Sequence, residues 1–263
     1  MKVKEVMEAL ERFAPLPLQE DYDNAGLQVG LTEAWEVSGA LLCLDVTEEV
    51  VDEAEAKGCN LIVSHHPLIF RKLRHVSDTT MTERIVFKAI EKKISIVSMH
   101  TNMDSAWGGV NFKIAEKMGL RDVAFLGETK TAEGVQGASG IMGNLPQPME
   151  AAEFIKMLKT TFGVECVQAN ELLQRPISRV AVCGGAGAFL LGDAIGAGAD
   201  AFVTGEMHYH DYFDTEQKIQ IAVIGHYQSE QFTKELFKEI IERECPGVKC
   251  CQSTINTNPI KYI

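Results

Sequence analysis

Short runs of apolar residues, many of them β-branched, recur along the chain and alternate with segments whose apolar residues follow helical spacing. Runs of this kind are typical of strands that are buried on both faces of a sheet. In the first part of the chain this pattern predicts strands near 37–46, 61–64 and 95–99, and helices over 48–57, around 81–92 and ending near 119. The βαβα alternation predicts a parallel or mostly parallel sheet covered by helices.

The pattern changes at residues 127–143, where glycines divide short segments, which we interpret as strands and turns at a domain junction. A second unit is predicted to follow, with helices near 148–162, through Asp193 and over 211–218, and strands over 163–168, 180–183 and 201–204. The last third returns to the first pattern, with a strand over 219–224, a helix over 229–243 and a strand over 248–252. We therefore expect the α/β class, with two α/β domains whose mainly parallel or mixed central sheets are flanked by helices. The expected limits are 1–126 plus 219–263 for a discontinuous, metal-binding domain, and 127–218 for the second domain.

Histidines follow the predicted strands. Of the seven histidines, all except His75 come directly after a short apolar run. In α/β sheets, ligands bind beyond the carboxyl ends of the strands, so imidazoles gathered there predict a metal site. The six residues are His65, His66, His100, His208, His210 and His226.

Each group of candidate ligands also has an ordinary structural interpretation. The adjacent His65 and His66 lie at a strand end, where both can turn to one site, but they can equally be hydrogen-bonded loop residues. Asp104, four residues after His100, is either a ligand or the N-cap of the next helix. Glu230 shares a helical face with His226 at the edge of an apolar stripe, where a buried carboxylate needs a metal, Arg or Lys as its partner.

Taken together, these residues predict a dinuclear centre. His65, His66, Asp104, His226 and Glu230 form a set of nitrogen and oxygen ligands that suits two divalent ions better than a structural zinc. The seven cysteines contain no CxxC pair and are typical of reduced, intracellular thiols. Two ions that share Glu230 and a water are suited to hydrolysis.

Two further groups could contribute to such a site. His208 or His210, which follow Glu206 after a strand, could move protons or contact substrate, or could belong to a solvated turn. The glycines of residues 184–187 could present amides to a phosphate, although close packing of a helix on a strand explains them as well.

Bulk properties narrow the class of protein. The formal net charge of −12 argues against a general nucleic-acid binder, because phosphate backbones require clustered Lys and Arg. The first residues are predicted to form an amphipathic helix, so we expect no secretory signal there. No apolar stretch approaches the roughly 20 residues that span a bilayer. We expect a cytoplasmic protein with a small-molecule substrate, and no membrane partner.

Six motifs, in order along nearly the whole chain, resemble the GTP cyclohydrolase 1 type 2 homologs, also called the NGG-interacting-factor-three-like proteins. They are the segment Asp23 to Gly30, Ser64 to Pro67, His100 with Asp104, Thr204 to His208, Gly225 to Glu230, and Asn258-Pro259.

This resemblance implies a two-domain α/β subunit with a dinuclear metal centre, and a toroidal homohexamer built as a trimer of dimers. It also implies that His65, His66, Asp104, His226 and Glu230 are the metal ligands, with Glu230 bridging the ions. His100 and His208 match positions that line the family's pocket, and we assign them as candidate catalytic residues.

Two functions remain open at this stage. The first is a metal-dependent hydrolase that uses two ions of Zn, Mn or Fe and acts on a nucleotide or a related small molecule, with GTP suggested by the family's name. The second is a non-catalytic metal-binding or regulatory ring that assembles partners or buffers metal. Open coordination positions on the ions would favour the enzyme.

Overall fold

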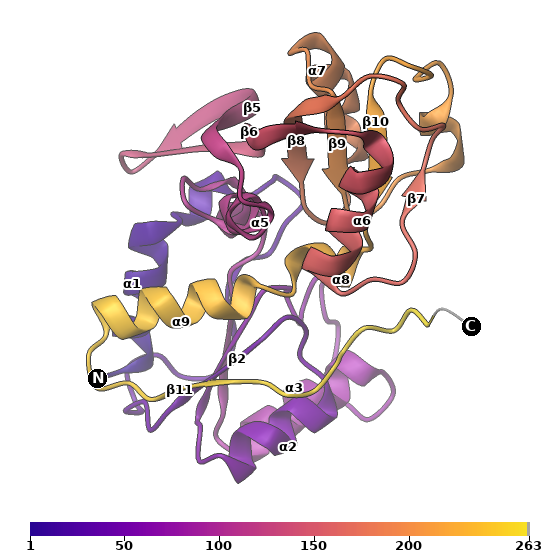
Figure 1. The fold of residues 1–263 in the computed structure, drawn as a ribbon. Coiled ribbons are helices and arrows are strands. Elements are labelled where there is room, and N and C mark those ends of the chain that lie inside the picture. The colour runs from indigo at the N-terminus through magenta and orange to yellow at the C-terminus, as the bar shows by residue number, and fades with distance from the viewer. Residues whose placement is uncertain (262–263) are drawn as a thin grey trace. The chain divides into compact units, whose positions relative to one another are not determined.

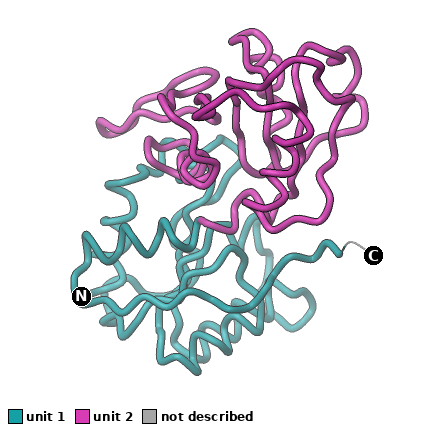
Figure 2. Tube along the Cα trace, viewed as in Figure 1, with its two compact units in different colours: residues 1–103, 233–263 teal, residues 104–232 magenta. Residues whose placement is uncertain are grey.

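The computed structural model describes residues 1–261 and divides into two compact units. Figure 2 shows residues 1–103 with 233–263 as one unit and residues 104–232 as the other. Each unit contains one sheet with helices, so the expected α/β class is confirmed. The domain limits expected from the sequence, 1–126 plus 219–263 and 127–218, concern independently folding domains and stay a prediction.

The sheet of the first unit is mostly parallel. Its strands lie in the order β1-β4-β3-β2-β11, and only β1 is antiparallel to its neighbour. All residues of β2, β3 and β4 are buried, which explains why these strands are continuous apolar runs without alternation. The strands are β1 (Gly26–Val29), β2 (Ala40–Cys43), β3 (Leu61–Ser64), β4 (Ser95–Ser98) and β11 (Cys250–Gln252).

Helices from both ends of the chain complete this unit. Helix α9 contacts α1, β2 and β11, so the yellow C-terminal segment in Figure 1 packs beside the earliest elements. Helices α2 and α3 contact each other and begin at Thr47 and Thr80, whose hydroxyl groups accept hydrogen bonds from backbone amides. The helices are α1 (Val3–Phe13), η1 (Leu16–Leu18), α2 (Glu48–Ala56), α3 (Met81–Glu91) and α9 (Thr233–Glu244), with α4 (Thr101–Ser105) at the limit between the units.

The sheet of the second unit is mixed, in the order β5-β6-β8-β9-β10-β7. Strands β8, β9 and β10 are parallel to one another, and the other pairs are antiparallel. The strands are β5 (Arg121–Ala132), β6 (Val135–Met149), β7 (Gln168–Ala169), β8 (Ile177–Cys183), β9 (Ala201–Thr204) and β10 (Gln220–Val223). The helices are α5 (Val110–Met118), α6 (Ala151–Phe162), η2 (Ala188–Leu190), α7 (Leu191–Gly196), η3 (Tyr209–Tyr212) and α8 (His226–Glu230).

The glycine-rich residues 127–143 differ from the prediction, because they belong to one long hairpin of β5 and β6. Two of its glycines allow Leu190 of η2 to pack closely against it. A Cβ atom on Gly140 would lie 2.5 Å from the Leu190 side chain, and Gly127, at φ 84°, lies where the β5–β6 register shifts. The expected strands and turn are therefore present, and only the strands are longer than the glycine spacing indicated, while the domain junction stays a prediction.

Three other local predictions were wrong. Residues 163–168 do not form a strand, because Gly163 ends α6 in the left-handed region and only Gln168–Ala169 pairs with β10. The helix predicted over 211–218 is present only as the end of the short η3 at Tyr212, since Asp214 and Gln217 also have positive φ. The helix predicted over 229–243 is two helices, α8 and α9. Among the described residues, no helix has the length and apolarity needed to cross a membrane.

Candidate functional site

Three histidines of the first unit converge beyond the carboxyl ends of β3 and β4. His65 and His66 follow β3 directly, and His100 lies two residues after β4. Their ring centroids are 5.0 Å apart for His65 and His66, 5.2 Å for His65 and His100, and 5.4 Å for His66 and His100. One nitrogen of each ring lies within 4.8 Å of the other two, which is close enough for a shared cation.

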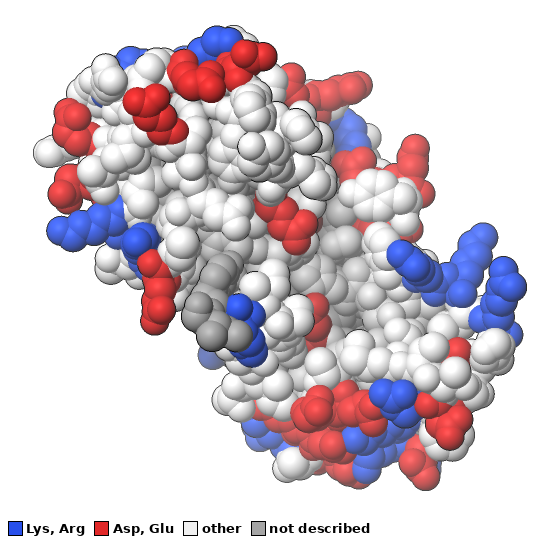
Figure 3. Space-filling model, turned by 90° about the vertical axis from the view of Figure 1, so that its right-hand side faces the viewer, with Lys and Arg blue, Asp and Glu red and all other residues white. Residues whose placement is uncertain are grey.

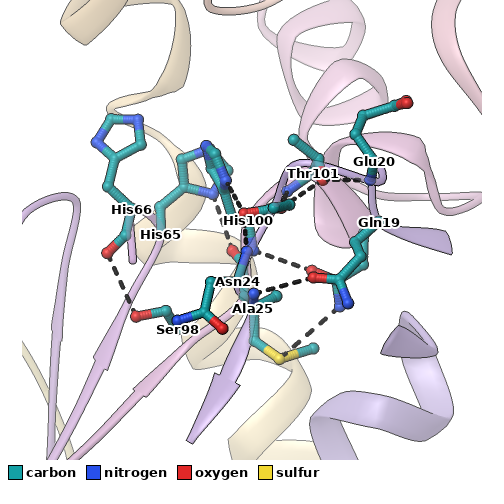
Figure 4. Close-up of polar contacts among 12 residues, drawn as sticks. Gln19, Glu20, Asn24, Ala25, His65, His66, Ser98, His100 and Thr101 are labelled. Atoms are coloured by element: carbon teal, nitrogen blue, oxygen red, sulfur yellow. Dashed lines mark hydrogen bonds and ion pairs between the residues drawn. The ribbon is translucent and has the colours of Figure 1, made fainter. Parts of the chain in front are cut away.

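Each of these rings is held through its Nδ1 atom, and Figure 4 shows this for His65 and His100. Nδ1 of His65 lies 2.9 Å from the carbonyl oxygen of Met99, and a carbonyl only accepts, so this nitrogen donates. Nδ1 of His66 lies 2.7 Å from Asp45 Oδ1, and Nδ1 of His100 lies 2.7 Å from Asp23 Oδ1. In the neutral ring this arrangement leaves the lone pair on Nε2, which is the usual tautomer of a metal-binding histidine.

The two supporting carboxylates are held in their charged form. Burial raises the pKa of Asp23, but the hydrogen bond and charge of His100 and the hydroxyl of Thr101 outweigh it and lower that pKa to about 2. Burial likewise raises the pKa of Asp45, and the hydrogen bond and charge of His66, with a 2.6 Å bond from Thr257, hold it below its usual value. Both carboxylates therefore stay anionic acceptors at neutral pH and keep the rings oriented.

A second group of candidate ligands lies in the second unit, beyond the end of β10. His226 begins α8 after Gly225, and its Nδ1 lies 2.7 Å from Glu206 Oε1. Its Nε2 lies 3.2 Å from Glu230 Oε2, one helical turn later, as the spacing of four residues predicted. The Glu230 side chain is only 4% exposed. An imidazole and a buried carboxylate thus point to the same place.

Glycines make room for this pair. A Cβ atom on Gly185, which has φ 59°, would overlap Oε1 of Glu230, and one on Gly205 would lie 2.9 Å from the Cα of His226. The amides of the same loop are already used. Gly184 donates to Asn111, Gly185 to Ser229 and Gly187 to Thr204, so close packing accounts for these glycines and those three amides are not offered to a phosphate.

The carboxylate of Asp104 joins this second group, because one of its oxygens lies within 4.8 Å of an oxygen of Glu230, whereas His208 and His210 lie apart. Asp104 lies within α4 and its carbonyl accepts from Asn111, whereas α5 begins at Gly109, so the prediction that Asp104 caps the following helix was wrong. The His208 side chain is 94% exposed and lies 3.6 Å from Asp211. His210 is exposed and stacks on Phe213. Neither belongs to the group of His226 and Glu230.

The supporting role of Asp45 was missed by the sequence analysis. Asp45 lies two residues beyond β2, at the same edge of the sheet as the histidines, and this position is the signal that could have identified it. The role of Thr257 could not be found in this way, because 212 residues separate it from Asp45 in the chain.

Comparison with known proteins agrees with the fold. The family model of Duf34/NIF3 (NGG1p interacting factor 3) matches residues 1–259. A "GTP cyclohydrolase 1 type 2 homolog" of Clostridium perfringens is 35% identical over 265 residues, covering all of both chains. The homolog of the same name from Streptococcus pneumoniae is 31% identical, again over all of both chains.

Solved structures show the same architecture. The Staphylococcus aureus hypothetical protein SA1388 has a TM-score of 0.91 and 29% identity over 100% of this chain and 99% of its own. A Bacillus cereus protein related to NIF3 has a TM-score of 0.89 at 24% identity, over 100% of this chain and 99% of its own. The resemblance inferred from the six motifs is therefore confirmed, and the chain belongs to the Duf34/NIF3 family.

Proposed function

We propose that this protein is a metal-dependent hydrolase that acts on a nucleotide or a related small molecule. The observation that carries the proposal is the shared arrangement of four histidines. His65, His66, His100 and His226 each direct Nδ1 to a backbone or carboxylate oxygen, so each neutral ring presents Nε2 to its site. A hydrogen bond from the ring nitrogen that does not face the metal orients metal-binding histidines in this way.

The donors fit divalent ions of intermediate hardness. Imidazole nitrogens with carboxylates, and no thiolate, suit Zn, Mn or Fe. The separation of 3.2 Å between His226 Nε2 and Glu230 Oε2 is near the roughly 3.3 Å between two ligands of a tetrahedral ion bound at about 2.0–2.1 Å. We propose that His65, His66, Asp104, His226 and Glu230 bind two such ions, with Glu230 bridging, as the resemblance implies.

The residues of the chain then have distinct roles. When bound, divalent ions supply Lewis acidity, which polarises a substrate oxygen and lowers the pKa of a water molecule. His100 is the candidate that moves a proton, at its Nε2, because Asp23 fixes its ring beside His65 and His66. The exposed His208 is a second candidate for contact with the substrate.

The names of the curated relatives support a small-molecule substrate. Several of them are called GTP cyclohydrolase 1 type 2 homologs, and we propose a nucleotide as the first substrate class to examine. The net charge of −12 argues against long nucleic acids as substrates.

The experiment is a hydrolysis screen on the metal-loaded protein, beginning with GTP, with Glu230→Gln as the test variant. The substitution keeps the volume of the buried side chain and removes its charge, so we expect metal-dependent turnover to be lost while the fold remains. Glu91→Gln is the control, because Glu91 is exposed on α3 and lies outside both groups of candidate ligands. If Glu230→Gln leaves turnover unchanged, the hydrolase proposal is wrong. If the protein binds metal but hydrolyses no nucleotide, the non-catalytic metal-binding ring is favoured.

We also propose that the chain is cytoplasmic and that, as the resemblance implies, it assembles as a toroidal homohexamer. Light scattering of the purified protein tests the assembly, and a mass near six times the 29.0 kDa of one chain is the expected result. A monomer or dimer across the tested concentration range would contradict it.

A further inference from the structure

A basic segment lies directly beyond the paired histidines. We call residues 70–76 the basic loop. It contains Arg71, Lys72 and Arg74 followed by His75, and no acidic residue occurs from Ala56 to Ser77. In a chain with a net charge of −12, this is a local excess of three positive charges.

The cations of the basic loop are exposed and lack ionic partners. Helices α2 and α3 show the opposite pattern, because Lys88 pairs with Asp52 and Lys92 with Glu55. In Figure 3, red and blue side chains lie side by side over the lower part of the molecule, whereas at one edge blue side chains project without red ones beside them. Within residues 1–261, Arg71, Lys72 and Arg74 form no ion pair and their side chains no hydrogen bond.

The basic loop lines a pocket of about 510 Å³, whose wall also includes Leu68, Thr80 and Thr82. One acidic residue, Glu83, lies in this wall. Its carboxylate is largely buried and already engaged, since it accepts a hydrogen bond from Ser77 and lies 3.5 Å from His75 Nε2. The accessible charge of the pocket is therefore positive.

Phe70 joins this pocket to the histidines. It lines the pocket, and its ring centroid is 6.2 Å from that of His100 in an edge-to-face arrangement. The exposed ring of Tyr22 lies 6.4 Å from Phe70 on the same unit. A ligand whose reacting group reaches the histidines can thus pass over aromatic side chains and place its other end among the cations.

We propose that the basic loop binds the phosphate groups of the substrate at a position separate from the metal ligands. Arginine and lysine together are the usual partners of phosphate oxygens, and these three have no competing carboxylate. The phosphate groups anchor the substrate, and the bond that is hydrolysed lies in another part of the substrate, beside the histidines. This inference rests on the proposed function, because it takes the histidine groups as the reacting centre.

The experiment measures binding of a phosphate series to the full-length protein by calorimetry. The series is guanosine, GMP, GDP and GTP, with inorganic tripolyphosphate as a probe without a base. The test variant carries Arg71→Gln, Lys72→Gln and Arg74→Gln. The control variant carries Lys93→Gln, Lys218→Gln and Lys249→Gln, which removes three exposed charges elsewhere and so lowers the net charge equally.

We expect affinity to rise from guanosine to GTP in the wild type and in the control variant. In the test variant this rise in affinity should disappear. GTP and tripolyphosphate should bind about tenfold or more weakly than to the wild type, because three charged contacts are lost. Added salt should weaken the wild-type interaction more than that of the test variant.

Metal content measured on the same samples separates this inference from the proposed function. If metal is present and the test variant keeps the full rise in affinity, the phosphates bind elsewhere, and the inference is overturned while the hydrolase proposal stands. If no metal is found but the rise depends on the basic loop, the inference stands and the proposed function fails. Equal losses in the two variants, or no affinity for any phosphorylated probe, would also overturn it.

Discussion

Replacing Glu53 by glutamine should loosen the C-terminal segment of the first unit. The Glu53 carboxylate on α2 accepts hydrogen bonds from Lys57 at 2.7 Å, from Ser253 Oγ at 2.5 Å, and from both the backbone amide and the hydroxyl of Thr254 at 2.9 Å. This segment continues to Thr257, which supports Asp45. The amide of glutamine offers only one acceptor oxygen, so several of these donors lose their partner.

The magnitude follows from the pKa of Glu53. Burial raises this pKa, but the hydrogen bonds from Lys57, Ser253 and Thr254 lower it from 4.5 to about 2. At about 1.4 kcal/mol per pKa unit the difference corresponds to about 3 kcal/mol. Because the carboxylate has some access to water, which screens its charge, we expect Glu53→Gln to lower the free energy of unfolding by about 2 kcal/mol at neutral pH.

The lowered pKa of Glu53 also determines how its contribution to stability changes with pH. A carboxylate whose pKa is lower in the folded state contributes its full stability above its unfolded pKa, here near 4.5, and loses it as pH falls towards about 2. In urea denaturation, the difference between wild type and Glu53→Gln should therefore be largest at pH 7 and shrink between about pH 5 and pH 2.

The control is Glu55→Gln on the same helix. The Glu55 side chain is 55% exposed and pairs with Lys92 on the surface, so its loss should change stability by less than about 1 kcal/mol. The reasoning would be refuted if Glu53→Gln were as stable as the wild type at pH 7. It would also be refuted if the difference in free energy of unfolding between Glu53→Gln and the wild type stayed constant down to pH 2.

Two further predictions concern the ligand groups. Asp45→Asn removes the charged acceptor of His66 Nδ1 and should weaken metal affinity about 10–100-fold in chelator competition. Unchanged affinity would show that Asp45 does not orient His66 for metal binding. Gly185→Ala places a methyl group against Glu230 at φ 59°, so it should lower metal content and cost about 1–3 kcal/mol of stability. Gly58→Ala, also at positive φ but with open space around it, is its control and should retain metal.

The strands and the edge that carries the histidines could be predicted because each depends on short-range sequence. The apolar runs of β3, β4, β9 and β10 are buried along their whole length, and the histidines follow where the strands end. The i and i+4 spacing also placed His226 and Glu230 on one helical face, as the structure has them. Such features need no knowledge of distant contacts.

The incorrect predictions depend on tertiary contacts or on backbone conformation. Residues 127–143 form part of a long hairpin because β6 pairs with β8 and the glycines admit the Leu190 side chain, which no local pattern reveals. The predicted helix over 211–218 fails at Asp214 and Gln217, non-glycine residues in the left-handed region. The support of His66 by Asp45 and Thr257 requires β2 and the C-terminal segment to lie beside β3.

The most direct test of the account is elemental analysis of the untagged protein by inductively coupled plasma mass spectrometry. We predict about two divalent ions per chain in the wild type, their loss in His65→Ala and in Glu230→Ala, and full retention in His208→Ala, whose side chain is exposed and outside both ligand groups. A wild-type protein without metal, even after reconstitution with Zn, Mn or Fe, would contradict the account and leave the histidines with a structural role alone.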